Sequence, residues 1–176
     1  AAYSHLSLVT AQAEEHEALA RRAHALCLKT GAAAQLAICY ANEAGETHYA
    51  YGDSATAVAC LEKAIELEAS EGGRDDYLER FYSRQAYELV NLGHFARAEQ
   101  RLTEAYSLIA ERDTGNYPDE PLYPPIELTA AQLHDARGEF QAARAEAERA
   151  PTDRLCRELL CRLALHAGDT AQAGEH

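Results

Sequence analysis

Apolar and polar residues follow a helical spacing that breaks at Gly52-Asp53 and resumes immediately afterwards. Small residues gather before the break, at Ala41, Ala44 and Gly45. After it, the positions typical of one buried helix face are Ala57, Leu61, Ala64 and Ile65. Because a Gly-Asp pair favours a turn, residues 33–70 are predicted to form two antiparallel helices joined by a tight turn. The small residues allow the two backbones to approach closely, with Leu61 filling the space between them.

The same spacing recurs further along the chain. Counted from Gly52, apolar residues follow after five, nine and twelve positions. Gly93 repeats this frame with Ala98, Leu102 and Ala105, and Gly138 repeats it with Ala143, Ala147 and Ala150. A further copy begins at Gly168 and reaches Ala173, and a weaker one comes first, with Ala18, Arg22 and Ala25 but with Ala13 in place of the glycine. The period is uneven, since Gly52, Gly93, Gly138 and Gly168 stand 41, 45 and 30 residues apart.

This frame resembles the tetratricopeptide repeat, a helical hairpin of 34 residues that stacks into arrays. The resemblance implies an all-α fold, an α-solenoid of antiparallel helix pairs that forms a single array over residues 1–176. About four and a half repeats are expected, at approximately 1–31, 33–70, 75–111, 122–150 and 152–176, the last of them truncated.

Several features depart from the family pattern. The chain has no Trp, and Ala69 and Ala110 stand where the family ends a repeat with Pro. Four of the five prolines lie between residues 118 and 125, so residues 112–124 are predicted to form an irregular loop. Longer and uneven repeats of this kind resemble the arrays appended to large bacterial transcriptional and signalling regulators.

Charge and hydropathy exclude two classes of partner. The net charge is −13 and the isoelectric point is near 5.0, which opposes binding to nucleic acid. No apolar run is long enough for a transmembrane helix or a signal segment, so no membrane partner is expected. The last copy of the frame stops at His176 in mid-hairpin. We therefore expect the chain to be a fragment of a longer protein whose other parts hold any enzymatic or DNA-binding activity.

The five cysteines show no disulfide framework. Cys27, Cys39, Cys60, Cys156 and Cys161 occupy helical positions, and their odd number favours a reducing, cytoplasmic setting in which most of them are buried as small apolar residues. His24 and Cys27 share one helix face, as metal ligands would, but paired short spacings of the zinc type are missing, so no metal and no cofactor are expected.

Catalytic motifs are also missing. The sequence contains no Gly-x-Ser-x-Gly elbow, no phosphate-binding glycine loop and no His-Glu-x-x-His. Glu43, Glu46 and His48 could supply an acid-base pair, but on a solenoid helix such residues are more often surface contacts. We therefore expect no catalytic residue and no enzyme activity in this chain.

In tetratricopeptide arrays the first helix of each hairpin lines a concave groove, and the resemblance assigns the groove positions here. Those predicted to contact a partner are Asn42, Glu46, Tyr49, Arg80, Ser83, Tyr87, Asn91, Gln132, Asp135 and Arg162. Asn and Arg can bond to a peptide backbone, and Tyr adds rigid contact area. A carboxylate at Glu46 would repel the acidic C-terminal tails that some relatives bind. The alternative is that these residues are only the solvated inner face of a solenoid that binds through another surface.

The leading interpretation is a protein-protein or peptide interaction module, the regulatory or sensor part of a larger bacterial signalling or transcription regulator. Self-association through the ends of the array is also expected, because uncapped ends of a solenoid expose apolar surface. The competing interpretation is a receptor that captures a small metabolite or signalling peptide in the groove. An aromatic cavity around Tyr49, Tyr82 and Tyr87 would favour the receptor. An enzyme built on a helical scaffold is the third class.

Overall fold

All regular structure in the described part of the protein is helical. The computed structural model describes residues 22–70, 75–111 and 125–168, without the side chains of residues 46–50, 75 and 76. Within these ranges there is no strand, as the alanine-rich helical spacing predicts. No helix of the described residues is long and apolar enough to cross a membrane. The expected loop at 112–124, residues 1–21 of the weak first copy and the end of the last copy lie outside the described residues.

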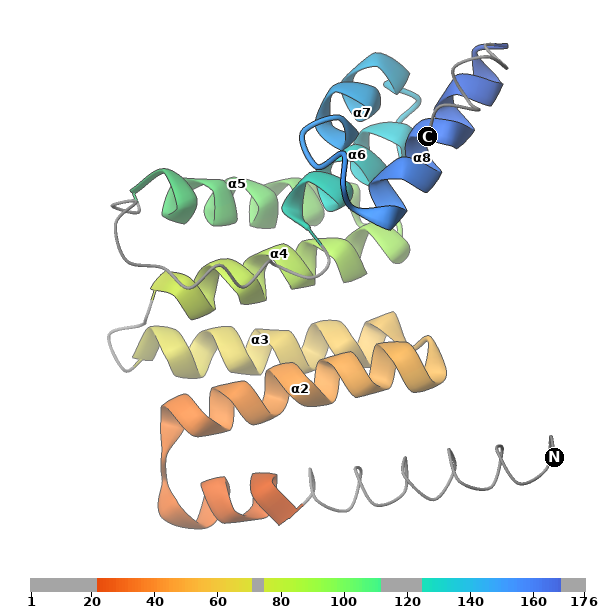
Figure 1. Ribbon diagram of the computed structural model, residues 1–176. Coiled ribbons are helices and arrows are strands. Elements are labelled where there is room, and N and C mark those ends of the chain that lie inside the picture. Colours follow the sequence, from red (N-terminus) through yellow and green to blue (C-terminus); the bar gives the residue numbers. More distant parts are fainter. Residues whose placement is uncertain (1–21, 71–74, 112–124, 169–176) are drawn as a thin grey trace, which may run out of the picture. The chain divides into compact units, whose positions relative to one another are not determined.

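The chain divides into two compact units, Ala1–Arg74 and Asp75–His176. The first unit contains a helix over residues 22–30, followed by α2 (Ala33–Tyr51) and α3 (Ser54–Ser70). Figure 1 shows α2 and α3 lying side by side as an antiparallel pair. The predicted hairpin of residues 33–70, with its turn at Gly52-Asp53, is therefore confirmed. Asp53 begins α3, because its carboxylate accepts hydrogen bonds from the backbone N–H and the hydroxyl of Thr56.

Small side chains form the contact between α2 and α3. Ala37 and Ala44 on α2 are completely buried, as are Ala57, Leu61 and Ala64 on α3. The alanines leave room for the two backbones, and Leu61 is the largest side chain that is completely enclosed in this hairpin. This is the packing that the spacing of the sequence predicts.

The second unit begins with the hairpin of α4 (Asp75–Asn91) and α5 (Phe95–Glu111), which is shown in green in Figure 1. After the undescribed stretch come α6 (Ile126–Ala136), α7 (Phe140–Ala147) and α8 (Arg154–His166). Helix α6 packs against α7 and also contacts α4, α5 and α8. It is thus the element through which the other helices of this unit are held together.

Both hairpins of the second unit turn in the same way. Gly93 and Gly138 have φ values of 75° and 77°, which a side chain with a Cβ atom adopts only at a cost. The N–H of the residue after each glycine bonds back across the turn, His94 to the carbonyl of Leu89 at 2.8 Å and Glu139 to that of His134 at 2.9 Å. These are the bonds of a Schellman motif, which ends a helix and reverses the chain. The glycines that mark the repeats in the sequence are therefore the turn residues of the structure.

The C-terminal part of the second unit has its own apolar core. Leu128 and Ala131 of α6 meet Ala143 and Ala147 of α7 there, together with the α8 side chains Cys156, Leu159, Leu160 and Leu163. The last position of the frame, Ala150, differs from its counterparts because α7 ends at Ala147 and Ala150 is only partly buried against this core. Pro151 explains the difference, since the residue before a proline is driven away from helical backbone angles.

Candidate functional site

The predicted partner-contacting residues of α4 fall into two groups. Arg80, Tyr87 and Asn91 are seven and four residues apart, so they share one face of the helix. Arg80 and Tyr87 are half-buried and Asn91 is exposed. Ser83, by contrast, is only 2% exposed, and its hydroxyl has no hydrogen-bond partner among the described residues. Ser83 therefore belongs to the interior and contributes no accessible surface.

The structure brings Asp135 and Arg162 together. An Arg162 Nη2 atom on α8 lies 2.5 Å from the Asp135 Oδ2 atom on α6, although the residues are 27 positions apart. Gln132, one turn earlier on α6, is half-buried, and its Oε1 accepts no hydrogen bond from the described residues. We call Arg80, Tyr87, Asn91, Gln132, Asp135 and Arg162 the first-helix row, since they lie on α4, α6 and α8.

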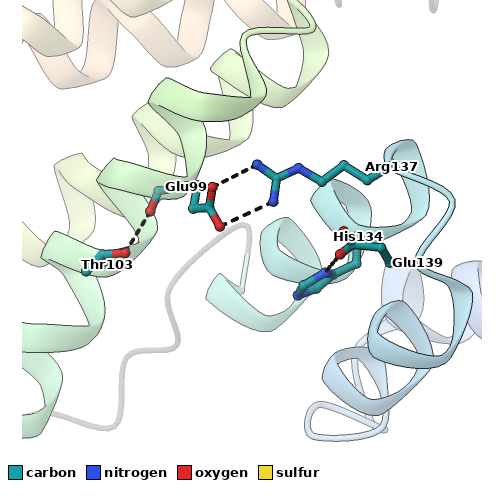
Figure 2. Close-up of polar contacts among 5 residues, drawn as sticks. All are labelled: Glu99, Thr103, His134, Arg137 and Glu139. Carbon is teal, nitrogen blue, oxygen red and sulfur yellow. Dashed lines mark hydrogen bonds and ion pairs between the residues drawn. The ribbon is translucent and has the colours of Figure 1, made fainter.

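The C-terminal end of α6 is fixed by two further contacts (Figure 2). Arg137 makes a forked ion pair with Glu99 of α5, with N–O distances of 2.8 and 3.3 Å. His134 Nδ1 lies 2.5 Å from Glu139 Oε2, at the start of α7. With the Asp135–Arg162 pair, these contacts tie one helix end to α5, α7 and α8. These contacts orient α6 through polar pairs of surface side chains.

Sequence reasoning missed Arg137, Glu99 and the His134–Glu139 pair. The signal for His134 and Glu139 was present, because both flank the predicted turn at Gly138. The partner of Arg137 is 38 residues away, so it follows only from the packing of α6 on α5. The forked geometry has an electrostatic consequence at Glu99, whose pKa is lowered by the Arg137 hydrogen bonds and then by the Arg137 charge.

Two tyrosine rings of the second unit pack against arginine side chains. The Arg101 guanidinium lies 5.3 Å from the centre of the Tyr82 ring, and that of Arg149 lies 5.8 Å from the Tyr106 ring. The Tyr106 hydroxyl donates a long hydrogen bond of 3.5 Å to Glu146 of α7. Burial, followed by the Glu146 charge, raises the pKa of Tyr106 to about 12. Tyr82, one of the three tyrosines whose cavity would favour the receptor interpretation, thus packs against Arg101 of α5.

In the first unit, Asn42 is exposed on α2 as expected for a binding residue. Glu46, His48 and Tyr49 also lie in α2, but their side chains are outside the described ones. Glu43 contacts His24 from the preceding helix, with 3.4 Å between Oε2 and Nδ1. The His24 ring meets the edge of the Tyr40 ring with 4.6 Å between centroids, and Lys63 of α3 lies over Tyr40 at 5.2 Å. His24 and Glu43 therefore connect two helices of this unit.

The expectation that most cysteines are buried is wrong. Cys60 and Cys156 are buried, but Cys27, Cys39 and Cys161 are only partly so. Cys27 and Cys39 come together across the turn at Gly31, with 3.7 Å between their sulfur atoms. Spacing in the sequence missed this pair because twelve residues separate them and a helix reversal brings them together. Among the described residues, no cluster of three or more His, Cys, Asp or Glu side chains could hold a metal ion.

Comparison of the sequence with known protein families and with curated proteins gives no match. The relationship to tetratricopeptide repeats therefore stays a prediction from the spacing of glycine and alanine. What the structure adds is the helical hairpins themselves, the turns at the marker glycines and the contacts of α6 with both α4 and α8.

Proposed function

We propose that the chain is an interaction module that binds an extended peptide or a protein segment along the first-helix row. The observation that carries this proposal is the placement of α6, which contacts both α4 and α8. The first helices of successive hairpins in the second unit are thereby neighbours. A partner that lies across them meets the first-helix row over three helices rather than one.

The chemistry of the first-helix row suits a peptide backbone. Asn91 offers an exposed amide, with both a donor and an acceptor for a peptide backbone. Tyr87 adds a half-buried ring, the kind of side chain that often dominates binding energy. The paired charges of Asp135 and Arg162 favour a partner that is neutral at that point, since a charged group would have to compete with an existing ion pair.

We further propose that the module regulates a larger bacterial signalling or transcription protein in the cytoplasm. The support is the resemblance to long, uneven repeat arrays of such regulators, together with the cysteine chemistry. The five cysteines are odd in number and show no disulfide framework, which fits a reducing compartment. The net charge of −13 makes direct contact of this chain with nucleic acid unfavourable, so any such contact falls to another part of the regulator.

The test is selection of peptides from a random linear library displayed on phage, followed by calorimetric titration of the best binder. We expect Tyr87→Ala to weaken binding by about tenfold or more and Asn91→Ala to weaken it less, as is usual around an aromatic hot spot. Gln100→Ala is the matched control, because Gln100 is exposed on α5, the second helix of the same hairpin. This control should bind as the unchanged chain does.

Two results would remove the proposal. One is a library that yields no binder. The other is a binder whose affinity is unchanged by Tyr87→Ala and Asn91→Ala but reduced by Gln100→Ala, which would place recognition on the second helices. Circular dichroism melts of each variant distinguish a lost contact from a lost fold.

A further inference from the structure

The pair of sulfur atoms at the start of the first unit is not used by the proposed function. Cys27 lies in the helix of residues 22–30 and Cys39 lies in α2, and the turn at Gly31 brings them face to face. Their sulfur atoms are 3.7 Å apart, which is van der Waals contact. A disulfide bond needs about 2.05 Å, so the two sulfur atoms must approach each other by less than about 2 Å to form one.

The backbone around the pair is well anchored on both sides. The carbonyl of Cys27 accepts a hydrogen bond from the Gly31 N–H at 3.0 Å and another from the Thr30 hydroxyl at 3.2 Å. Cys39 is the seventh residue of α2, a helix of 19 residues, so it lies inside the helix rather than at its end. The two helices are also held together within about one turn of the cysteines by the contacts of His24 with Tyr40 and Glu43. The thiols therefore face each other as a lasting feature of the hairpin.

The two thiols are accessible and chemically different. Both side chains are only partly buried, so a small oxidant can reach them. The Cys39 thiol donates its hydrogen to the sulfur of Cys27. Burial, together with that hydrogen bond, raises the pKa of Cys39 to about 11, so Cys39 keeps its proton at neutral pH. Because the Cys39 thiol is the donor in this contact, we assign Cys27 as the sulfur that attacks first and Cys39 as the one that follows.

We infer that Cys27 and Cys39 form a reversible redox site that a low-molecular-weight disulfide, such as oxidised glutathione, converts to an intramolecular disulfide. In the first step, the Cys27 thiolate attacks one sulfur of the oxidant and forms a mixed disulfide, and the displaced thiolate takes up a proton. In the second, Cys39 loses its proton and its sulfur attacks Cys27, which breaks the mixed disulfide and releases a second small thiol. The protein loses two electrons and two protons, and the oxidant is reduced to two thiols.

The consequence of closure is a covalent tie between the helix of residues 22–30 and α2. The tie removes freedom mainly from the unfolded chain, so the oxidised first unit should be the more stable form. Oxidation thereby sets how readily the helix of residues 22–30 separates from α2. This inference is independent of the peptide-binding proposal, because it concerns the first unit and needs no partner.

The test uses the full chain treated with oxidised glutathione, alkylated and mapped by mass spectrometry after digestion. We expect a peptide pair linked through Cys27 and Cys39, lighter by two hydrogen atoms than the reduced pair and separated again by dithiothreitol. In Cys39→Ser, glutathione should stay attached to Cys27, because the second sulfur is missing. In Cys27→Ser, Cys39 should take up glutathione more slowly than Cys27 does in Cys39→Ser. Cys161→Ser is the matched control, since Cys161 is also partly buried but lies in the second unit, and it should leave the link unchanged.

Thermal unfolding gives a second readout that does not depend on digestion. The oxidised chain should melt about 5–10 °C higher than the reduced chain in the transition of the first unit. Cys39→Ser should show no such rise, while its reduced form keeps the helical spectrum of the unchanged chain. The inference is overturned if the link does not form, if Cys27 joins a cysteine other than Cys39, or if the alkylation pattern of the glutathione-treated chain is the same as that of the untreated chain.

Discussion

At the scale of single residues, the protein depends on a few positions with an unusual backbone. Gly31, Gly52, Gly93, Gly138 and Gly168 all have φ values between 65° and 77°, and each of them follows a helix. An added Cβ atom would meet nothing within 4 Å at any of these positions. The requirement for glycine is therefore conformational, and it does not come from crowding.

Because the backbone angle alone requires glycine, the cost of a substitution at Gly138 should depend on which residue replaces it. Replacement by Ala should lower the free energy of unfolding by about 1 kcal/mol, the usual cost of a side chain in the left-handed region. Gly138→Asn should cost less, because Asn tolerates that region, and Gly138→Val should cost more. Urea unfolding of the three variants measures the series. An Ala variant as stable as the unchanged chain would contradict the assigned backbone angle.

The second prediction at this scale concerns Glu99. Its lowered pKa means that the pair with Arg137 contributes stability above the ordinary glutamate pKa of about 4.3 and loses that contribution as the pH falls through the lowered value. An NMR titration should therefore give Glu99 a pKa below the ordinary value, and Arg137→Gln should raise it toward that value. Arg144→Gln, which removes a pair with Glu148 instead, should leave the titration of Glu99 unchanged.

At the scale of elements, the hairpins hold together because small residues face one another. Ala57 is completely buried between α2 and α3, whereas Ala59, two positions along the same helix, is exposed. Helix formation tolerates Leu about as well as Ala. Substitution by Leu at the two sites therefore distinguishes an effect on packing from an effect on helix propensity. The same arrangement recurs at Ala98 and Ala105 of α5, which are also completely buried.

Ala57→Leu should therefore destabilise the first unit by about 1–3 kcal/mol, because the larger side chain pushes α2 away from α3. Ala59→Leu should change stability by less than about 0.5 kcal/mol, as surface substitutions usually do. Chemical unfolding followed by circular dichroism measures both variants. Equal effects at the two positions would contradict the close approach of the two helices.

At the scale of the whole molecule, charge and exposed apolar residues oppose each other in self-association. Leu26 and Leu28 are 61% and 59% exposed, and the net charge is −13. Light scattering should show a mass that rises above the monomer value of 19.3 kDa with protein concentration, and more steeply with added salt, which screens the repulsion. Replacing both leucines by Ser should reduce the rise. A monomer at every concentration and salt level would exclude self-association.

The parts of the fold that could be predicted are those governed by neighbouring residues. Gly52 and Gly93 marked the turns, and the buried stripe of Ala57, Leu61 and Ala64 followed from helical spacing. Contacts between distant residues could not be predicted in this way. The Arg137–Glu99 pair depends on how α6 packs on α5, which no local spacing encodes.

The candidate site shows the same division. Asp135 and Arg162, chosen from the resemblance, pair with each other in the structure, and Ser83, chosen in the same way, is buried. A polar residue type indicates exposure only on average. The position of the residue around the helix decides whether its side chain is buried. The contact between Cys27 and Cys39 was missed because a reversal at Gly31 is needed to see it.

The Schellman turns at Gly93 and Gly138 have a consequence for how such a gene can change. Every hydrogen bond that closes them joins residues no more than five positions apart, such as Glu139 to His134. Each of these turns is therefore closed entirely by bonds within its own hairpin. An in-frame duplication or loss of one whole hairpin leaves the remaining turns intact. Chains of this kind can therefore change length by recombination without needing new turn sequences.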